Sequence, residues 1–197
     1  MQIDLDLLYT WGAIAKKYKK NEIIFNEDET ACFYYQIIEG SVRAFNSNDE
    51  GKEFTQGIFY SGECFGEPPL FINEVYPSKT IALHDCTIIK LSKDKFLKVL
   101  DEYPSIQKSF LSALAYKIHS KTSTSKDIIN QKPEFRVTAF LNNFKKKSGT
   151  LKDTVLIPYT RQEIANFTGL RVETVIRVFT KMNSSKKVDI INHKIYY

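Results

Sequence analysis

The sequence has little of what builds metal centres or disulfide frameworks. Its three cysteines, Cys32, Cys64 and Cys86, are widely spaced and include no Cys-x-x-Cys pair. An odd, scattered set fits reduced thiols and argues against a disulfide framework, a zinc site or an iron–sulfur site. None of the three histidines is within 30 residues of another, so the His-x-His pair of a cupin-type enzyme is missing. The residues therefore identify no cofactor.

Long apolar runs are also missing. No stretch approaches the ~20 apolar residues that a membrane-spanning helix requires. The start, "MQIDLDLLYTW", lacks the basic region and the cleavage site of a signal peptide. We therefore expect a cytoplasmic protein without a membrane partner.

Charge is ordinary in amount but unevenly distributed. Residues 1–132 hold 16 Lys and Arg against 18 Asp and Glu, a net charge of −2. Residues 133–197 hold 12 against 5, a net charge of +7. The last third is thus a small basic unit attached to a slightly acidic body. Such a unit suggests a polyanion partner, although a merely solvated basic face gives the same count.

The first half of the chain has the pattern of short strands. After a helical lead-in over residues 1–17, runs rich in Ile, Phe, Tyr and Val alternate with turn residues. These runs are "NEIIF", "CFYYQIIEG", "SVRAF", "FTQGIFY" and "TIALHDCTIIKLS". Many short strands at regular spacing predict an antiparallel sandwich or roll.

The pattern then becomes helical. "KDKFLKVLDEY" is a helix that breaks at Pro104, and a long helix follows over residues 105–130. An apolar stripe at spacings of three and four marks this helix: Leu111, Leu114 and Ile118. Its stretch "SKTSTSK", residues 120–126, suits a solitary surface helix poorly, because Ser and Thr each cost up to ~0.5 kcal/mol relative to Ala. A helix that continues there has a partner, either a second helix or a ligand; a loop is the alternative.

Pro133 marks a hinge into the basic unit. "EFRVTAFLNNFKKK" is a helix that ends at Ser148-Gly149, and "TVLIPYT" is a short strand. The chain closes with "KKVDIINHKIYY", two apolar runs around Asn192-His193, which predict a β-hairpin.

Two short helices lie between that strand and the hairpin. Thr160 and Glu163 form a capping box that starts the first helix, and Thr168-Gly169 ends it. A second helix begins within two or three residues. Helix, tight glycine turn and helix together are the helix-turn-helix signature.

The second of these helices has two different sides. One side carries Val172, Val175, Val178, Phe179 and Met182, and the other carries Glu173, Arg177 and Thr180, with Ile176 at the boundary. In one interpretation Glu173 and Arg177 form a surface ion pair worth about 0.3–0.5 kcal/mol. In the other, Arg177 donates two hydrogen bonds to guanine and Glu173 accepts one from cytosine. The capped helix, the hairpin and the +7 charge favour DNA reading.

These segments together resemble the CRP/FNR transcription regulators over nearly the whole chain. "GECFGEPPLF" is similar to the family's Gly-Glu-x-x-Gly-Glu segment in its ligand-binding β-roll, and "TRQEIANFTGLRVETVIRVF" resembles its helix-turn-helix closely. The resemblance implies an α+β fold: an N-terminal antiparallel β-roll of the cyclic-nucleotide-binding type (1–103), a long dimerisation helix with hinge (104–132) and a C-terminal winged helix-turn-helix (133–197). It also implies a homodimer on double-stranded DNA, with RNA polymerase as a candidate protein partner.

The resemblance carries DNA-binding roles onto matching positions. Glu173 and Arg177 match the family's base-reading Glu and Arg, which read a TGA-type core. Five positions are assigned to the DNA backbone: Thr160, Arg161, Gln162, Arg171 and Thr174. Arg171 caps a helix poorly but can reach a phosphate. Val172 replaces the extra Arg of the cyclic-AMP branch and Ile176 replaces the Ser of the FNR branch, so the outer bases of the half-site stay unassigned.

The effector pocket implied by the resemblance contains Gly66, Glu67, Ser78, Lys79 and Thr122. Cyclic-AMP binders of the family follow the Glu with an Arg-Ser pair whose Arg holds the cyclic phosphate, whereas this chain has proline before Ser78. Proline neither donates a hydrogen bond nor carries charge. We therefore expect an effector other than cyclic AMP, unless Lys79 replaces the Arg as a point charge. The cysteine cluster by which the FNR branch senses oxygen is also missing.

Two other functions compete with this one. A cupin-type enzyme has a small β-roll but needs the missing metal ligands. A cyclic-nucleotide module that regulates a protein partner needs the missing phosphate Arg, and requires neither the helix pair nor the basic last third. We therefore predict a transcription regulator, not an enzyme, that binds a pseudo-palindromic TGA-containing site as a homodimer.

Overall fold

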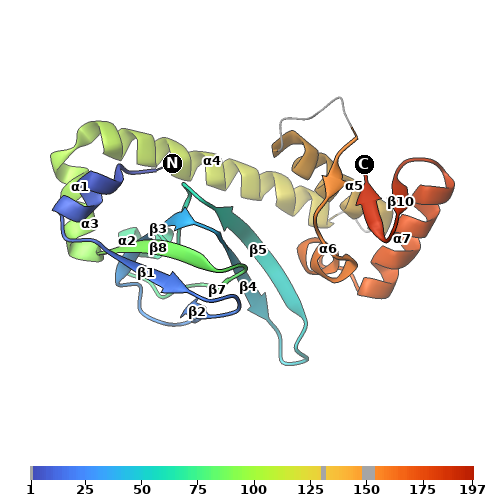
Figure 1. Ribbon diagram of the computed structural model, residues 1–197, viewed down its shortest axis with the longest axis horizontal. Helices are drawn as coiled ribbons and strands as arrows, with labels where there is room; N and C mark the ends of the chain where they lie inside the picture. The colour runs from blue at the N-terminus through green and yellow to red at the C-terminus, as the bar shows by residue number, and fades with distance from the viewer. Residues whose placement is uncertain (1, 130–131, 148–153) are drawn as a thin grey trace. The chain divides into compact units, whose positions relative to one another are not determined.

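Strands fill the first part of the chain and helices dominate the last (Figure 1). The computed structural model describes residues 2–129, 132–147 and 154–197, without the side chains of 120, 123–129 and 147. The chain divides into two units, Met1–His119 and Ser120–Tyr197. Each unit has its own apolar core.

The first unit is an antiparallel roll, as predicted. It begins with helix α1, Leu5–Thr10, and holds a short helix α2, Pro68–Ile72. Its strands are β1 Ile14–Tyr18, β2 Ile23–Phe25, β3 Phe33–Glu39, β4 Ser41–Ser47, β5 Glu53–Tyr60, β6 Cys64–Phe65, β7 Lys79–Ala82 and β8 Cys86–Ser92. The described strands form two four-stranded sheets, in the orders β1-β8-β3-β6 and β2-β7-β4-β5.

Two details of the predicted roll are wrong. The helical lead-in ends at Thr10, and part of it is instead strand β1, which pairs with β8. Only Tyr18 of β1 is buried and the preceding four residues are exposed, so the strand lacks the alternation that reveals strands in a sequence. The run "TIALHDCTIIKLS" divides into β7 and β8, which belong to different sheets.

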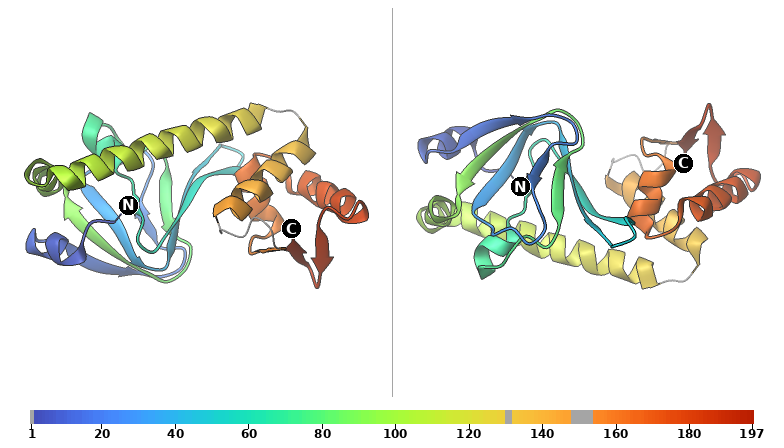
Figure 2. Two further views of the ribbon diagram at one scale, coloured as in Figure 1. Left: turned by 90° about the horizontal axis from the view of Figure 1, so that it is seen from above. Right: turned by 90° about the horizontal axis from the view of Figure 1, so that it is seen from below.

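Two helices follow the roll. Helix α3 spans Lys93–Glu102, and α4 spans Pro104–Ile129 as one unbroken helix (Figure 2). The chain therefore breaks at Pro104 as predicted, because proline fits the first turn of a helix but not its interior. Residues 120–126 lie within α4, so the loop alternative is wrong.

The second unit is a winged helix-turn-helix, as predicted. Its elements are α5 Pro133–Lys147, β9 Leu156–Ile157, α6 Arg161–Thr168, α7 Val172–Ser184, β10 Asp189–Ile191 and β11 Lys194–Tyr196. The strands form a small sheet in the order β10-β11-β9. The helices α5, α6 and α7 share one core that includes Leu141, Ile164 and Phe179. The predicted helix end at Ser148-Gly149 lies outside the described residues.

Candidate nucleic-acid interface

Helix α6 is capped at both ends, and the cap at its C-terminal end forms the turn into α7. The Glu163 amide donates to the Thr160 hydroxyl at 3.1 Å, and the Thr160 amide donates to the Glu163 carboxylate at 2.7 Å. Gly169 ends the helix at φ 65°, a left-handed conformation that glycine adopts without strain. The predicted capping box and glycine turn are both confirmed.

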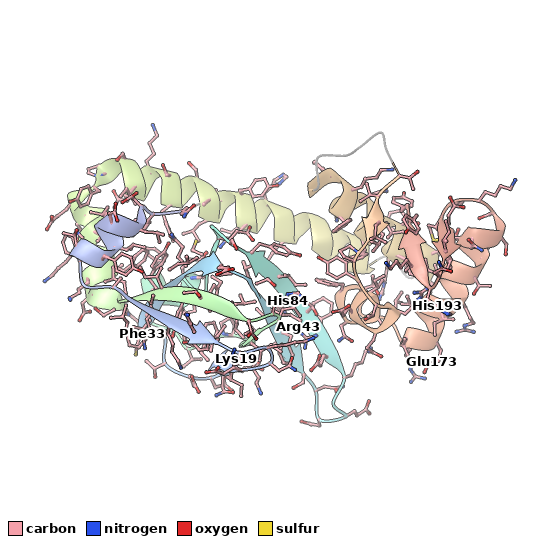
Figure 3. All side chains as sticks on the ribbon, viewed as in Figure 1. Lys19, Phe33, Arg43, His84, Glu173 and His193 are labelled. Carbon is pink, nitrogen blue, oxygen red and sulfur yellow. The ribbon has the colours of Figure 1, made fainter. Side chains whose placement is uncertain are left out.

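Helix α7 separates its buried side from its exposed side as the sequence predicted. Four apolar residues are buried: Val175, Val178, Phe179 and Met182. Glu173, Ile176, Arg177 and Thr180 are exposed, and Figure 3 shows Glu173 at the start of the helix. Arg171 occupies the N-cap position, and its side chain makes no capping hydrogen bond. The exposed face is thus available to a partner outside the chain.

Glu173 and Arg177 do not form the surface ion pair that was the alternative interpretation. The Arg177 guanidinium instead donates to the Thr174 hydroxyl at 3.4 Å, and the two charged side chains, both within the described residues, form no salt bridge with each other. The Thr180 hydroxyl donates to the Ile176 carbonyl at 3.0 Å. Both charged groups therefore keep hydrogen-bonding capacity for DNA bases.

The predicted backbone-contact residues on α6 already have partners within the protein. The Thr160 hydroxyl belongs to the cap described above. The Arg161 guanidinium donates to the His193 carbonyl, and the Gln162 amide donates to the Asn166 side chain at 2.9 Å. His193 lies at the tip of the β10–β11 hairpin (Figure 3), where it and Asn192 adopt positive φ. Arg161 thus joins the start of α6 to the wing.

Glu134, on α5, is a residue that the sequence argument missed. Its carboxylate accepts hydrogen bonds from Lys181 at 2.9 Å and from Lys187 at 3.2 Å. These hydrogen bonds hold the pKa of Glu134 below its usual value. The contacts connect α5 to Lys181 in the last turn of α7 and to Lys187, which follows that helix. The partners are separated by 47 and 53 residues along the chain, so no local sequence pattern predicts these contacts.

The predicted effector residue Glu67 is buried inside the roll and is paired there. Only 1% of it is exposed. The Lys117 ammonium, on α4, donates to its carboxylate at 2.5 Å and to the Cys64 carbonyl at 3.0 Å. Burial is the largest single influence and lowers the pKa of Lys117, but Glu67, Cys64 and Glu63 together raise it, so the net pKa lies above its usual value. Lys117 was not predicted, because it lies 50 residues from Glu67.

Aromatic rings fill the interior next to this pair. The Phe25 ring stacks on Tyr76 with 3.8 Å between centroids and lies 6.0 Å from Phe65. A Cβ on Gly66 would come within 3.0 Å of the Phe25 ring. Lys117 also lies 5.3 Å from the centroid of Phe59.

The other predicted pocket residues lie at the start of β7 and on α4. Ser78 is buried just before β7, and Lys79 is half-buried on that strand. Its neighbour Thr80 is fully buried opposite the core residue Phe25. Because successive residues of a strand face opposite sides, Lys79 points away from the interior that Thr80 faces. Thr122 belongs to the second unit.

Models of two known domains match the chain. A cyclic nucleotide-binding domain model matches residues 15–103, and a Crp-like helix-turn-helix domain model matches residues 135–196. The chain belongs to the CRP/FNR family of transcription regulators. This CRP/FNR protein is therefore a DNA-binding regulator, and the match over its last third accounts for the segment that a lone nucleotide module would not require.

Relatives of this CRP/FNR regulator include proteins of different kinds. The transcriptional activatory protein AadR of Rhodopseudomonas palustris is 27% identical, over 89% of this chain and 73% of AadR. The cAMP-activated global transcriptional regulator CRP of Pasteurella multocida is 28% identical, over 82% of this chain and 79% of that protein. The c-di-GMP responsive global regulator CLP of Xanthomonas campestris has the same fold, with a TM-score of 0.82 at 19% identity over 96% of each chain.

Among the described residues, no group of three or more His, Cys, Asp or Glu side chains is placed to hold a metal ion. Over those same ranges, no helix is both long and apolar enough to cross a membrane.

Proposed function

We propose that this CRP/FNR regulator binds a pseudo-palindromic DNA site with a TGA-type core. The observation that carries the proposal is the exposed face of α7, where Glu173 and Arg177 are not paired with each other. In the major groove, Arg177 would donate to O6 and N7 of guanine, and Glu173 would accept from N4 of cytosine. One turn of helix separates these residues, so they contact neighbouring base pairs.

We propose that the protein binds as a homodimer through α4. Phe110 of this helix is buried in the first core, and Leu114 packs against that core. Leu111 and Ile118 are each 68% exposed on another face, with the exposed Ala115 between them. A second copy of α4 is the occupant that such a stripe fits. The dimer would place two α7 helices in major grooves about one helical turn apart.

We also propose that cyclic AMP is not the effector. The chain has Pro77 where cyclic-AMP binders carry the phosphate-binding Arg, and Lys79 points away from the interior. Glu67 is already neutralised by Lys117. Proteins that this chain resembles differ in their signals, since one is cAMP-activated and another is c-di-GMP responsive. RNA polymerase as a partner and a cytoplasmic location complete the proposal.

Fluorescence anisotropy of labelled duplexes tests these three claims together. The duplexes are a palindrome with TTGA in each half-site, a scrambled duplex, and the palindrome with about five base pairs, half a helical turn, added at its centre. We expect tight binding to the palindrome alone, unchanged by cyclic AMP. Equal binding to the scrambled duplex contradicts base reading, and equal binding to the lengthened duplex contradicts the fixed dimer. Binding that requires cyclic AMP overturns the effector claim.

A further inference from the structure

Ile176 is an apolar residue on the face of α7 proposed to read DNA. It is 49% exposed, and it lies outside the apolar core of the second unit. The core side of α7 is complete without it, since Val175, Val178 and Phe179 are buried. A β-branched residue also lowers helix propensity relative to Ala or Leu at an exposed position. Neither packing nor helix formation therefore accounts for isoleucine here.

Its neighbours place Ile176 within the reading face. At 100° per residue, Ile176 and Arg177 lie on opposite flanks of the line that joins Glu173 and Thr180. The Arg177 guanidinium is held on its own flank by the Thr174 hydroxyl. The Thr180 hydroxyl is bonded to the helix backbone at the Ile176 carbonyl. Ile176 therefore presents an apolar surface beside the two polar readers.

The major groove offers one apolar feature to such a surface. Thymine carries a methyl group at C5, whereas the remaining base edges there present hydrogen-bond donors and acceptors. A branched hydrocarbon side chain can bury that methyl group, but it can satisfy neither the amino group of cytosine nor a carbonyl oxygen. The chemistry of Ile176 thus favours thymine over cytosine at the position it covers.

We propose that Ile176 reads the C5 methyl group of a thymine next to the G·C pair contacted by Glu173 and Arg177. The inference rests on the proposed function, because it needs α7 to lie in the major groove. It deepens that function by assigning the thymine beside the guanine to one residue, which recognises it by an apolar contact and not by a hydrogen bond.

Deoxyuridine tests the proposal, because it differs from thymidine only by the missing methyl group. A duplex selected by the wild-type protein from a randomised pool is remade with each thymine replaced in turn, at one fixed salt concentration. We expect one thymine per half-site at which replacement weakens binding about fourfold, the value of one buried methyl group, and about 15-fold when both half-sites are changed. Ile176→Ala should weaken binding to the parent duplex and should not respond to uracil at that position.

Two control variants separate the possible results. Ile176→Val keeps a branched side chain and should retain most of the response. Ile14→Ala removes another exposed isoleucine, from the first unit, and should change nothing. If uracil weakens binding equally for the wild type and for Ile176→Ala, or at no position, Ile176 does not read the methyl group although the protein reads DNA. A pool that yields no selected sequence overturns the proposed function itself, and this inference with it.

Discussion

The reading face of α7 and the interior of the roll use their charged groups in opposite ways. Glu173 and Arg177 are exposed and form no ion pair with each other, although they are one turn apart. Glu67 is 1% exposed and is held at 2.5 Å by Lys117. A buried charge needs a partner inside the chain. An exposed charge is stabilised by water and can bind a partner from outside the chain. The exposed face is open to a partner outside the chain, whereas the carboxylate that the sequence predicted to bind an effector is paired with a lysine of the same chain.

The largest effect should come from breaking the interior pair. Lys117→Met leaves the Glu67 carboxylate buried without a counter-charge, which should lower the free energy of unfolding of the first unit by about 3 kcal/mol. The loss should lie at the lower end of the range for buried ion pairs, because 33% of the Lys117 side chain is exposed. Urea unfolding followed by tryptophan fluorescence measures it, since the single tryptophan, Trp11, packs against the core of this unit.

Two controls show whether the missing charge is the cause. Lys108→Met removes an exposed lysine from the same helix and should change the unfolding free energy by less than about 0.5 kcal/mol. The double variant Lys117→Met, Glu67→Leu removes both charges and should recover most of the loss. If Lys117→Met is as stable as the wild type, the pair does not hold α4 to the roll.

The next largest effect should distinguish two exposed arginines of the reading helix. Arg177→Ala should weaken binding to the TTGA palindrome by about 1–3 kcal/mol and relax specificity at one G·C pair. Arg171→Ala should weaken binding to every duplex alike and reduce the slope of log affinity against log salt by about one, as expected for a phosphate contact. Anisotropy titrations over a panel of single-base variants and salt concentrations measure both. A uniform loss for Arg177→Ala would make it a backbone contact.

Much of the helix-turn-helix formed by α6 and α7 could be predicted, because the sequence features that define it lie close together along the chain. The box of Thr160 and Glu163, the glycine at 169 and the apolar stripe of α7 each lie within a few residues along the chain. Their geometry follows from helix periodicity and from the need to satisfy helix ends. The hydrogen bonds from Lys181 and Lys187 to Glu134 were not predicted, because only the folded unit brings these residues together.

The roll could be predicted as a class of fold but not as a site. Alternating apolar residues predicted most strands, whereas β1 was not predicted because its residues are mainly exposed. The motif around Glu67 predicted an effector pocket. The partner of the Glu67 carboxylate in the structure is Lys117, which lies on a helix 50 residues away along the chain. Tertiary packing decides whether a buried carboxylate binds a ligand or is paired with a basic residue of the same chain. A short sequence motif does not encode that packing.

A smaller effect should come from the cap that fixes α6. Thr160→Ala removes the hydroxyl that accepts from the Glu163 amide, and should cost about 1 kcal/mol of stability in the second unit. Thr160→Ser keeps the hydroxyl and should behave like the wild type. Hydrogen exchange of the Glu163 amide measures the loss at the bond itself. If Thr160→Ala leaves this exchange unchanged but weakens DNA binding, the hydroxyl serves as the predicted backbone contact instead.

The smallest effect concerns the cysteines, and it tests how closed the roll is beside the Glu67–Lys117 pair. Burial, reinforced by the Glu67 charge, raises the pKa of Cys64 to about 11. At pH 8 only about one in a thousand Cys64 groups is then a thiolate, the form that reacts. Cys32 is exposed, so iodoacetamide should label it first, as read by peptide mass spectrometry, and all three cysteines should react in urea. Labelling of Cys64 at the rate of Cys32 in the folded protein would mean that the interior opens to solvent, and that the contrast with the reading face is one of degree.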